Sequence, residues 1–214
     1  MSSAPAVISS VSLSTSEAKW LVLKKLTYRD AEGKERFWEC AERTTRKSSG
    51  IDAVAVLALI RSKTNAFPIS TIVIEQYRPP IDKFIIVENI LRQCLGLIDD
   101  GETPEQAAIR ELEEETGFKA TSVVEATPVV VADPGMTNAN MKLVVVCVDL
   151  ADKMETPRQK LDAGEFIVKR VVEIAKLNDE LKEYDAKGFV VDAKLAHWAA
   201  GYEMARRIAA GEFA

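Results

Sequence analysis

The sequence predicts a sandwich of helices and strands, of the α/β or α+β class. Apolar, β-branched runs at 52–60 and 70–77 are typical of buried strands. Further strands are expected near 122–132, 141–149 and 165–172. One acidic helix with start and stop signals lies between these runs. A central helix flanked by strands implies a sheet with helices packed against it.

The first part of the chain is expected to form a separate hairpin. Lys19–Arg29 and Lys34–Arg46 have the composition of strands, and Asp30–Gly33 between them has that of a turn. A Ser-rich stretch precedes the hairpin and is typical of a disordered tail. We therefore expect a disordered tail at 1–17, a β lobe at 18–48 and a main domain at 49–214.

Two prolines mark the end of a strand. Arg78-Pro79-Pro80 ends the run at 70–77, because proline has no N–H to donate to a sheet.

Two helices are expected to close the chain. A short helix is predicted at Lys176–Tyr184 with Gly188 in the following turn, and a longer one is predicted to be capped by Asp192. The longer helix carries an apolar stripe at Leu195, Ala199, Tyr202 and Ile208.

The most informative segment, from Gly96 to Phe118, centres on the acidic helix. Thr103 is expected to be the N-cap of this helix, with Pro104 at its first position and Gln106 completing a capping box. Gly117 stands where a left-handed residue would end the helix. These signals bound one short helix.

Three glutamates of this helix indicate a metal site. Glu111, Glu114 and Glu115 fall at positions i, i+3 and i+4 and share one face. Like charges at this spacing repel by roughly a few tenths of a kcal/mol per pair, so a cation is expected beside them. Mg²⁺ prefers such oxygen ligands. Arg110 is expected on a different side of the helix from Glu114, orienting a carboxylate or the loop. The alternative is a solvated acidic face.

The spacing of the segment points to one family. Gly96 is followed after five residues by Glu102, and after seven more by the run RELEEETGF at 110–118. This pattern resembles the Nudix box at every fixed position, whereas acidity alone explains neither Gly96, Arg110 nor Gly117. The resemblance implies a Nudix α/β/α sandwich with a mixed sheet, and hydrolysis of a diphosphate.

The resemblance also assigns roles to the residues of the box. Mg²⁺, or alternatively Mn²⁺, would be bound by Glu111, Glu114, Glu115 and the backbone carbonyl of Leu95. The geometry of the loop and helix would be maintained by Gly96, Glu102, Arg110 and Gly117. Two or more metal ions about 3.5–4 Å apart would polarise the phosphoryl group and lower the pKa of the attacking water.

Outside the box, several segments resemble the ADP-ribose pyrophosphatase branch, also called ADP-sugar diphosphatases. Pro134 lies 16 residues beyond Phe118, as in members that hydrolyse ADP-ribose. Asp133 and Gly135 beside it would line the sugar end of the substrate, although an ordinary Pro-Gly turn explains the same residues. Glu165 resembles the loop glutamate proposed as the catalytic base of this branch. The alternatives are a base on the acidic helix, Glu114 or Glu115, and a merely exposed Glu165.

The N-terminal lobe carries the candidates for nucleotide binding. Trp20 and Trp38 resemble a pair of tryptophans that sandwich adenine in dimeric members, where each lobe reaches over its partner. Such stacking is worth about 1–3 kcal/mol per base, and the alternative is core packing. Glu39 follows Trp38 in a stretch that matches the family's contacts. Arg43 and Arg78 would grip the diphosphate through forked guanidinium groups, unless they are simply solvated.

One segment, residues 81–95, departs from the branch. It contains IDKFIIVENILRQCL where family members run through an acidic residue, an apolar one and Pro-Ala into the glycine. Glu88 is a candidate for the displaced acidic residue. The segment is either a genuine bulge, which would affect metal affinity, or non-coding sequence translated by mistake.

Composition excludes several other classes. A net charge of −5 argues against nucleic acid binding, and no run approaches the ~20 apolar residues of a membrane span. Cys40, Cys94 and Cys147 lack metal-ligand spacing, and the N-terminus lacks a signal-peptide pattern. We therefore expect the cytoplasm, with the nucleus as an alternative. His197 is the only histidine, which excludes mechanisms that need two.

The sequence thus predicts a Mg²⁺-dependent homodimer that hydrolyses ADP-ribose to AMP and ribose 5-phosphate. One alternative is an enzyme for another nucleoside diphosphate derivative, such as an ADP-hexose or an oxidised nucleotide. A second is a module that binds ADP-ribose without turning it over. The intact glutamates favour an enzyme, and the departure before Gly96 favours the module.

Overall fold

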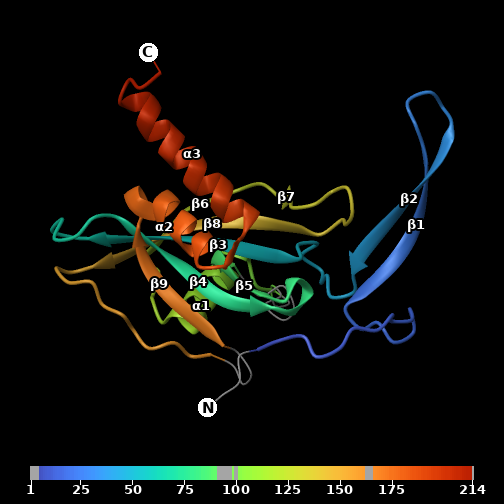
Figure 1. The fold of residues 1–214 in the computed structure, drawn as a ribbon, viewed down its shortest axis with the longest axis horizontal. Coiled ribbons are helices and arrows are strands. Elements are labelled where there is room, and N and C mark those ends of the chain that lie inside the picture. Colours follow the sequence, from blue (N-terminus) through green and yellow to red (C-terminus); the bar gives the residue numbers. More distant parts are fainter. Residues whose placement is uncertain (1–4, 91–97, 99–100, 162–165, 214) are drawn as a thin grey trace.

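The computed structural model describes residues 5–90, 98, 101–161 and 166–213, and consists of an eight-stranded sheet, three helices and a separate two-stranded hairpin (Figure 1). The strands are β1 (Leu21–Arg29), β2 (Glu35–Arg43), β3 (Ala53–Ser62), β4 (Ser70–Arg78), β5 (Lys83–Ile90), β6 (Ser122–Ala126), β7 (Val130–Val131), β8 (Asn140–Leu150), β9 (Ile167–Glu173) and β10 (Val190–Val191). The helices are α1 (Pro104–Thr116), α2 (Leu177–Ala186) and α3 (Ala193–Ala209), with 3₁₀ turns at Pro79–Ile81 and Ile174–Lys176.

The large sheet is mixed, as predicted. Its strand order is β10-β5-β4-β3-β8-β6, with β9 paired to β4 and β7 paired to β8. The β3–β8 and β5–β10 pairs are parallel, and the pairs that join β4 to β5 and to β9 are antiparallel. Strand β3 lies between β4 and β8 and is buried over most of its length, in keeping with its run of apolar residues.

Strand β5 is an element that the sequence analysis did not predict. It lies within the atypical segment 81–95 and pairs with β4 from Val73↔Glu88 to Arg78↔Lys83. Its Ile86 is fully buried. The first part of the segment is therefore an internal strand of the sheet, while residues 91–95 lie outside the described part of the chain.

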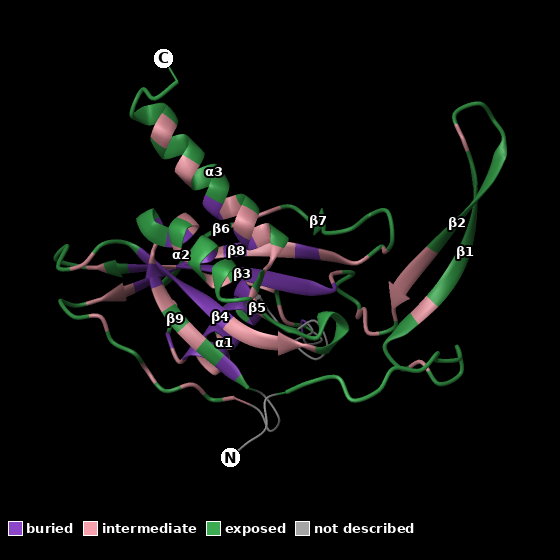
Figure 2. Ribbon diagram, viewed as in Figure 1, coloured by how far each residue is buried: buried purple, intermediate pink, exposed green. Residues whose placement is uncertain are grey.

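Helices cover both faces of the sheet, which confirms the predicted sandwich. On one face, α1 packs Ala108 and Leu112 against Val56 and Val144 of β3 and β8. On the other face, α2 and α3 cover a second cluster that contains Val73, Ile86, Leu181 and Leu195. Figure 2 shows these buried strands beneath the helices. Because strand residues alternate between faces, adjacent residues of β4 feed different clusters.

The local signals of α1 act as the sequence predicts. The Thr103 side chain accepts a hydrogen bond from the Gln106 N–H, and the Gln106 side chain accepts one from the Thr103 N–H. Gly117 is left-handed, with φ 75°, and its N–H donates to the Glu113 carbonyl. A Cβ at Gly117 would collide with the Arg158 carbonyl, so this position needs glycine for space as well as for conformation.

The apolar stripe predicted on α3 is only half right. Asp192 caps the helix by accepting from the Lys194 N–H, and Leu195 and Ala199 are buried as expected. Tyr202 and Ile208 are exposed because the helix runs past the sheet (Figure 2). Thirteen residues of helix also turn Ile208 about 220° away from Leu195, so the two do not share a face.

The hairpin of β1 and β2 is a sheet of its own that extends away from the main domain (Figure 1). Its strands pair antiparallel from Leu21↔Arg43 to Arg29↔Glu35. At the turn, Asp30 Oδ1 accepts from the N–H groups of Glu32 and Lys34. Exposed apolar side chains occur along the hairpin, including Leu21, Leu23, Leu26, Tyr28 and Phe37.

The segment that precedes the hairpin has few contacts. Residues 5–13 are extended and exposed, and a turn follows at 15–17. The Val7 N–H donates to Asp82 Oδ1, which also accepts from the Tyr77 hydroxyl. Among the residues that the structure describes, no helix is long and apolar enough to cross a membrane.

Candidate active site

Arg110 organises the acidic face of α1. Its Nε and Nη2 donate to the two carboxylate oxygens of Glu102 at 3.0 and 3.1 Å. Its Nη1 donates to Glu111 Oε1 at 2.6 Å and to Glu114 Oε2 at 3.1 Å. The bonds to Glu102, followed by those to Glu111, raise the pKa of the Arg110 guanidinium despite its partial burial. One arginine thus gathers three of the carboxylates.

The predicted direction of Arg110 is therefore wrong in part. The sequence analysis placed it on a different side of the helix from Glu114, yet the two side chains meet. Residues four apart are just over one helical turn apart, so the contact follows from helix geometry. The expectation that Arg110 orients a carboxylate agrees with this contact.

The three candidate metal ligands differ in exposure. Glu111 and Glu115 are buried, at 5 % and 3 % exposed, whereas the Glu114 side chain is 47 % exposed. Buried carboxylates need a cationic or hydrogen-bonding partner. Oxygen donors of this kind fit a hard divalent ion. Among the described residues, however, no group of three or more such side chains is already arranged around a metal position.

Contacts that the sequence analysis missed hold the last turn of α1. The Gln159 side chain donates to the Glu115 carbonyl at 2.7 Å, and the Lys160 N–H donates to the Glu114 carbonyl at 2.8 Å. Lys169 Nζ donates to the carbonyls of Thr116 and Pro157. Burial lowers the pKa of the Lys169 amine. No sequence motif announces these residues, since they act through backbone carbonyls.

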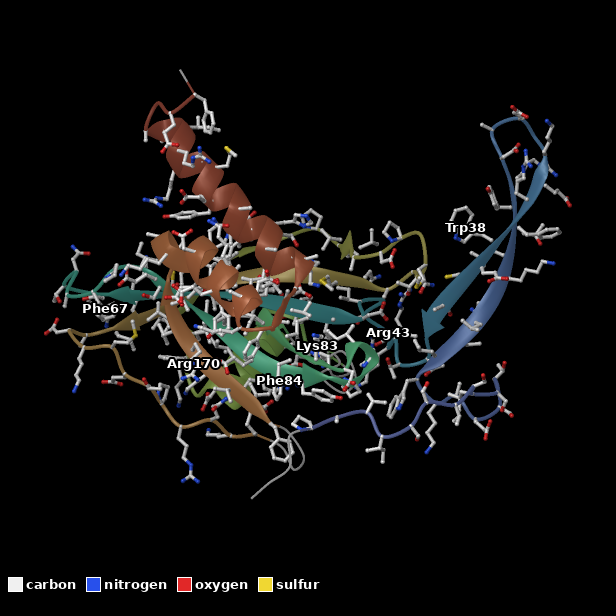
Figure 3. The ribbon with its side chains drawn as sticks, viewed as in Figure 1. Trp38, Arg43, Phe67, Lys83, Phe84 and Arg170 are labelled. Atoms are coloured by element: carbon white, nitrogen blue, oxygen red, sulfur yellow. The ribbon has the colours of Figure 1, made fainter. Side chains whose placement is uncertain are left out.

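The loop at 133–138 meets the hairpin. The indole N–H of Trp38 donates to the Gly135 carbonyl at 2.8 Å, and the Ala41 N–H donates to the Met136 carbonyl at 2.9 Å. Ala41 also forms a parallel bridge with Thr137. In Figure 3, Trp38 points from β2 toward the main domain. The structure thus brings together Trp38 and the loop of Asp133 and Gly135.

A cavity of about 290 Å³ opens where the hairpin and this loop meet. Trp38 of β2 and Gly135 of the loop line it. The remaining lining residues are Leu26, Cys40, Val131, Pro134, Met136, Thr137 and Asn138. A flat aromatic ring at the wall of a cavity can receive a planar heterocycle.

Trp20 and Trp38 do not meet within one chain. Trp20 directly precedes β1 and its carbonyl accepts from the Thr44 N–H, whereas Trp38 pairs with Leu26. Trp20 and Leu26 are six residues apart in an extended chain. Trp20 and Trp38 are therefore separated by roughly 20 Å along the hairpin, at about 3.3 Å per residue. Both rings are about half exposed. One chain alone cannot place both on a single base.

The other predicted site residues have separate locations. Glu39 is next to Trp38 in β2, so the two side chains leave opposite faces of the strand. Arg43 ends β2, near the main domain (Figure 3), and Arg78 ends β4. Three further predicted residues, Leu95, Gly96 and Glu165, lie outside the described part of the chain.

Glu88, the candidate for a displaced acidic residue, is buried in β5. Its side chain lies on the face covered by α3, because Glu88 pairs with Val73 of that cluster. Burial raises the pKa of the Glu88 carboxyl to about 7; the charge of Asp192 adds to this rise and that of Lys194 opposes it. Glu88 therefore lies on the opposite face of the sheet from α1.

The structure is an α/β/α sandwich with a carboxylate face on α1. The Nudix domain model matches residues 53–192. The chain belongs to the Nudix family.

Curated relatives match most of this chain. It is 41% identical over 198 residues to an uncharacterised Nudix hydrolase of Schizosaccharomyces pombe, covering 92% of each chain. An ADP-ribose pyrophosphatase of Saccharomyces cerevisiae is 39% identical, over 90% of this chain and 81% of the relative. An ADP-sugar pyrophosphatase of Mus musculus is 40% identical, over 84% of this chain and 80% of the relative. A crystal structure of an ADP compounds hydrolase has the same fold, with a TM-score of 0.58, 19% identity and 89% coverage of both chains.

Proposed function

We propose that this Nudix pyrophosphatase hydrolyses the diphosphate of ADP-ribose, and of related ADP-sugars, to AMP and ribose 5-phosphate. The observation that carries the proposal is the intact carboxylate face of α1, with Glu111, Glu114 and Glu115, in a chain whose relatives include ADP-ribose and ADP-sugar pyrophosphatases at 39–40% identity. Its cellular location is proposed to be the cytoplasm, with the nucleus as an alternative.

The metal would be Mg²⁺, with Mn²⁺ as the alternative. Glu111, Glu114 and Glu115 would hold it, with the carbonyl of Leu95. A bound ion of this kind polarises the phosphoryl oxygens and acidifies a water. Arg110 offsets the negative charge of Glu111 and Glu114 and holds the two carboxylates together by donating to both. The donor types fit such an ion, since all of them are oxygens.

The reaction adds water across the P–O–P linkage. The water oxygen bonds to one phosphorus, the bond from that phosphorus to the bridging oxygen breaks, and the water proton passes to a carboxylate base. Glu165 is the proposed base, with Glu114 or Glu115 as the alternative. Glu114 is the most exposed of the three proposed metal ligands, so a water can reach it.

Recognition of the substrate would divide between the hairpin and the main domain. Trp38 offers a ring beside the 290 Å³ cavity for the adenine, and Asp133 and Gly135 would line the sugar. Arg43 and Arg78 would bind the diphosphate through their guanidinium groups. Glu39 would contact the nucleotide from the same strand as Trp38.

A second copy of the chain would complete the adenine site. Trp20 lies too far along the hairpin from Trp38 to reach the same base within one chain, and the hairpin exposes Leu23 and Phe37. A homodimer would bury these side chains and bring a partner Trp20 to the base. The 18–48 lobe would then serve dimerisation and adenine binding, and 49–214 would carry the chemistry. Light scattering should show twice the mass of the chain; a monomer would contradict the shared site.

A substrate panel tests the proposal. The values of kcat/KM for ADP-ribose, ADP-hexoses and oxidised nucleotides should be measured with Mg²⁺, because selectivity is a difference in transition-state binding. ADP-ribose should have the highest value. A higher kcat/KM for another nucleoside diphosphate derivative would mean that this derivative is the substrate and that the type of reaction is as proposed. Binding of ADP-ribose without turnover would instead indicate a binding module.

A further inference from the structure

The junction between the hairpin and the main domain is built around one buried carboxylate. Asp52 immediately precedes β3, and its side chain is 1 % exposed. Arg46 Nε donates to Asp52 Oδ1 at 2.9 Å, and Arg46 Nη2 donates to Asp52 Oδ2 at 2.5 Å. This is a bidentate pair, the geometry in which a guanidinium binds a carboxylate most firmly.

Asn140, at the start of β8, completes the surroundings of Asp52. The Asn140 N–H donates to Asp52 Oδ2, and the Asp52 N–H donates back to Asn140 Oδ1, both at 2.9 Å. The Asn140 side chain also donates to the Gly50 carbonyl at 2.9 Å. The carboxylate of Asp52 therefore joins the segment that leaves the hairpin to strands β3 and β8.

The same arginine reaches the loop that holds Trp38. Arg46 Nη2 donates to the Asn138 carbonyl at 2.8 Å, and the Asn138 side chain donates to Glu42 of β2 at 3.0 Å. The loop is also hydrogen-bonded to Trp38 and to Ala41. A continuous series of polar contacts thus runs from Asp52 through Arg46 and Asn138 to β2.

Electrostatics support the same grouping. Burial would raise the pKa of the Asp52 carboxyl, but the hydrogen bonds from Arg46 and Asn140 and the charges of Arg46 and Arg43 hold this pKa below its ordinary value. Asp52 consequently stays ionised and balances both arginines at the end of β2. One of them, Arg43, is the residue proposed to bind the diphosphate.

We propose that Asp52 is a positioning residue: through Arg46 it fixes the hairpin on the main domain, and so sets where Trp38 and Arg43 meet the nucleotide. The effect of Asp52 on nucleotide binding rests on the function proposed above. Its effect on the position of the hairpin does not depend on which substrate is bound. The nucleotide-binding consequence follows because Arg46 also binds the loop that contacts Trp38, and stacking requires a ring in a fixed place.

The test uses the full-length protein and two variants of the pair. Asp52→Asn keeps the shape and removes the charge, while Arg46→Lys keeps the charge and removes the fork. The second variant covers the case in which the first fails to fold. Asp30→Asn is the matched control, because Asp30 pairs with Arg36 Nε at 2.9 Å and accepts from the Glu32 and Lys34 N–H groups, all within the hairpin.

Two measurements are made on each protein. Hydrogen exchange followed by NMR reports the Ala41 N–H and the Trp38 indole N–H, which bridge the hairpin to the loop. Protection of both should fall roughly tenfold in Asp52→Asn and Arg46→Lys, while the amides of β3 keep their protection. Steady-state kinetics should show KM for ADP-ribose raised roughly tenfold with kcat changed less than about threefold. Asp30→Asn should match the wild type in both.

The outcomes separate this proposal from the one on which it rests. Unchanged exchange at Ala41 and Trp38 in both variants overturns the positioning role, as does a wild-type KM. A fall in kcat at constant KM also contradicts it. If the wild type does not hydrolyse ADP-ribose, the proposed function fails. The exchange data then still decide whether Asp52 holds the hairpin.

Discussion

Arg110 and Glu102 form a bidentate ion pair across eight residues of sequence, while a third nitrogen of the same guanidinium serves Glu111 and Glu114. The pair joins the loop before α1 to the middle of the helix. Glu102 and Arg110 are thus the residues that connect the acidic face to the polypeptide that leads into it. The spacing of eight positions between Glu102 and Arg110 allows this ion pair to form.

Arg110→Lys should lower kcat/KM roughly 10- to 100-fold, because an ammonium cannot bind Glu102 through two bonds and Glu111 through a third. The free energy of unfolding should change by less than about 1 kcal/mol, since the Arg110 side chain is about a third exposed. Kinetics and urea denaturation check the two parts. Lys160→Gln is the control: it removes an exposed partner of Glu113 on the same helix and should change kcat/KM less than about twofold. Equal losses in the two variants would contradict the role of Arg110.

Gly117→Ala should destabilise the fold by more than about 1 kcal/mol, because the new Cβ adds a collision with the Arg158 carbonyl to the strain of a positive φ. Gly188→Ala is the matched comparison. Its φ is 88°, but a Cβ there meets nothing within 4 Å. Urea denaturation should rank Gly117→Ala well below Gly188→Ala in stability. The same loss at both positions would show that the close approach of residues 157–158 costs nothing.

Glu88→Gln should stabilise the protein above neutral pH. The folded-state pKa of Glu88 is raised to about 7 from 4.5. The folded state therefore holds the proton longer than the unfolded state does, and the contribution of Glu88 to stability falls as pH rises from about 4.5 to 7. The gain at pH 8 should be at most about 3 kcal/mol and should vanish near pH 4. Denaturation of both proteins at several pH values checks this; a gain independent of pH would contradict it.

Trp38→Ala should raise KM for ADP-ribose roughly 10- to 100-fold, since base stacking on an aromatic ring is worth about 1–3 kcal/mol. Tyr28→Ala is the control, because Tyr28 is an exposed aromatic residue of the same hairpin that pairs with Arg36 near the turn and does not line the cavity. It should leave KM unchanged. Steady-state kinetics compares the two. A similar rise in both would point to a general loosening of the hairpin instead.

Local features were predictable from the sequence, and features that depend on distant contacts were not. The bounds of α1 follow from Thr103, Gln106 and Gly117, whose caps are made within a few residues. Strand β5 was missed although its main partner, β4, directly precedes it in the sequence; only its pairings with β3 and β10 join distant segments. The direction of Arg110 was misjudged, although helix spacing alone would have placed it beside Glu114.

The residues around the site also divide into those that the sequence predicted and those that it did not. The acidic face of α1 was found from spacing, because metal-ligand carboxylates must share one side of a helix. Asp52 was missed although Arg46 is only six residues away, because its other partner, Asn140, is 88 residues away in the sequence. Lys169 was missed because it binds backbone carbonyls, which leave no mark in the sequence.

The most direct test of the account combines ADP-ribose, Mg²⁺ and one substitution. Purified wild-type protein and Glu115→Gln are incubated with ADP-ribose, with and without Mg²⁺, and the products are separated by chromatography. We expect AMP and ribose 5-phosphate from the wild type only when Mg²⁺ is present, and a rate at least about 100-fold lower from Glu115→Gln. Equal product formation by the two proteins, or formation without metal, would contradict a metal-dependent site on α1.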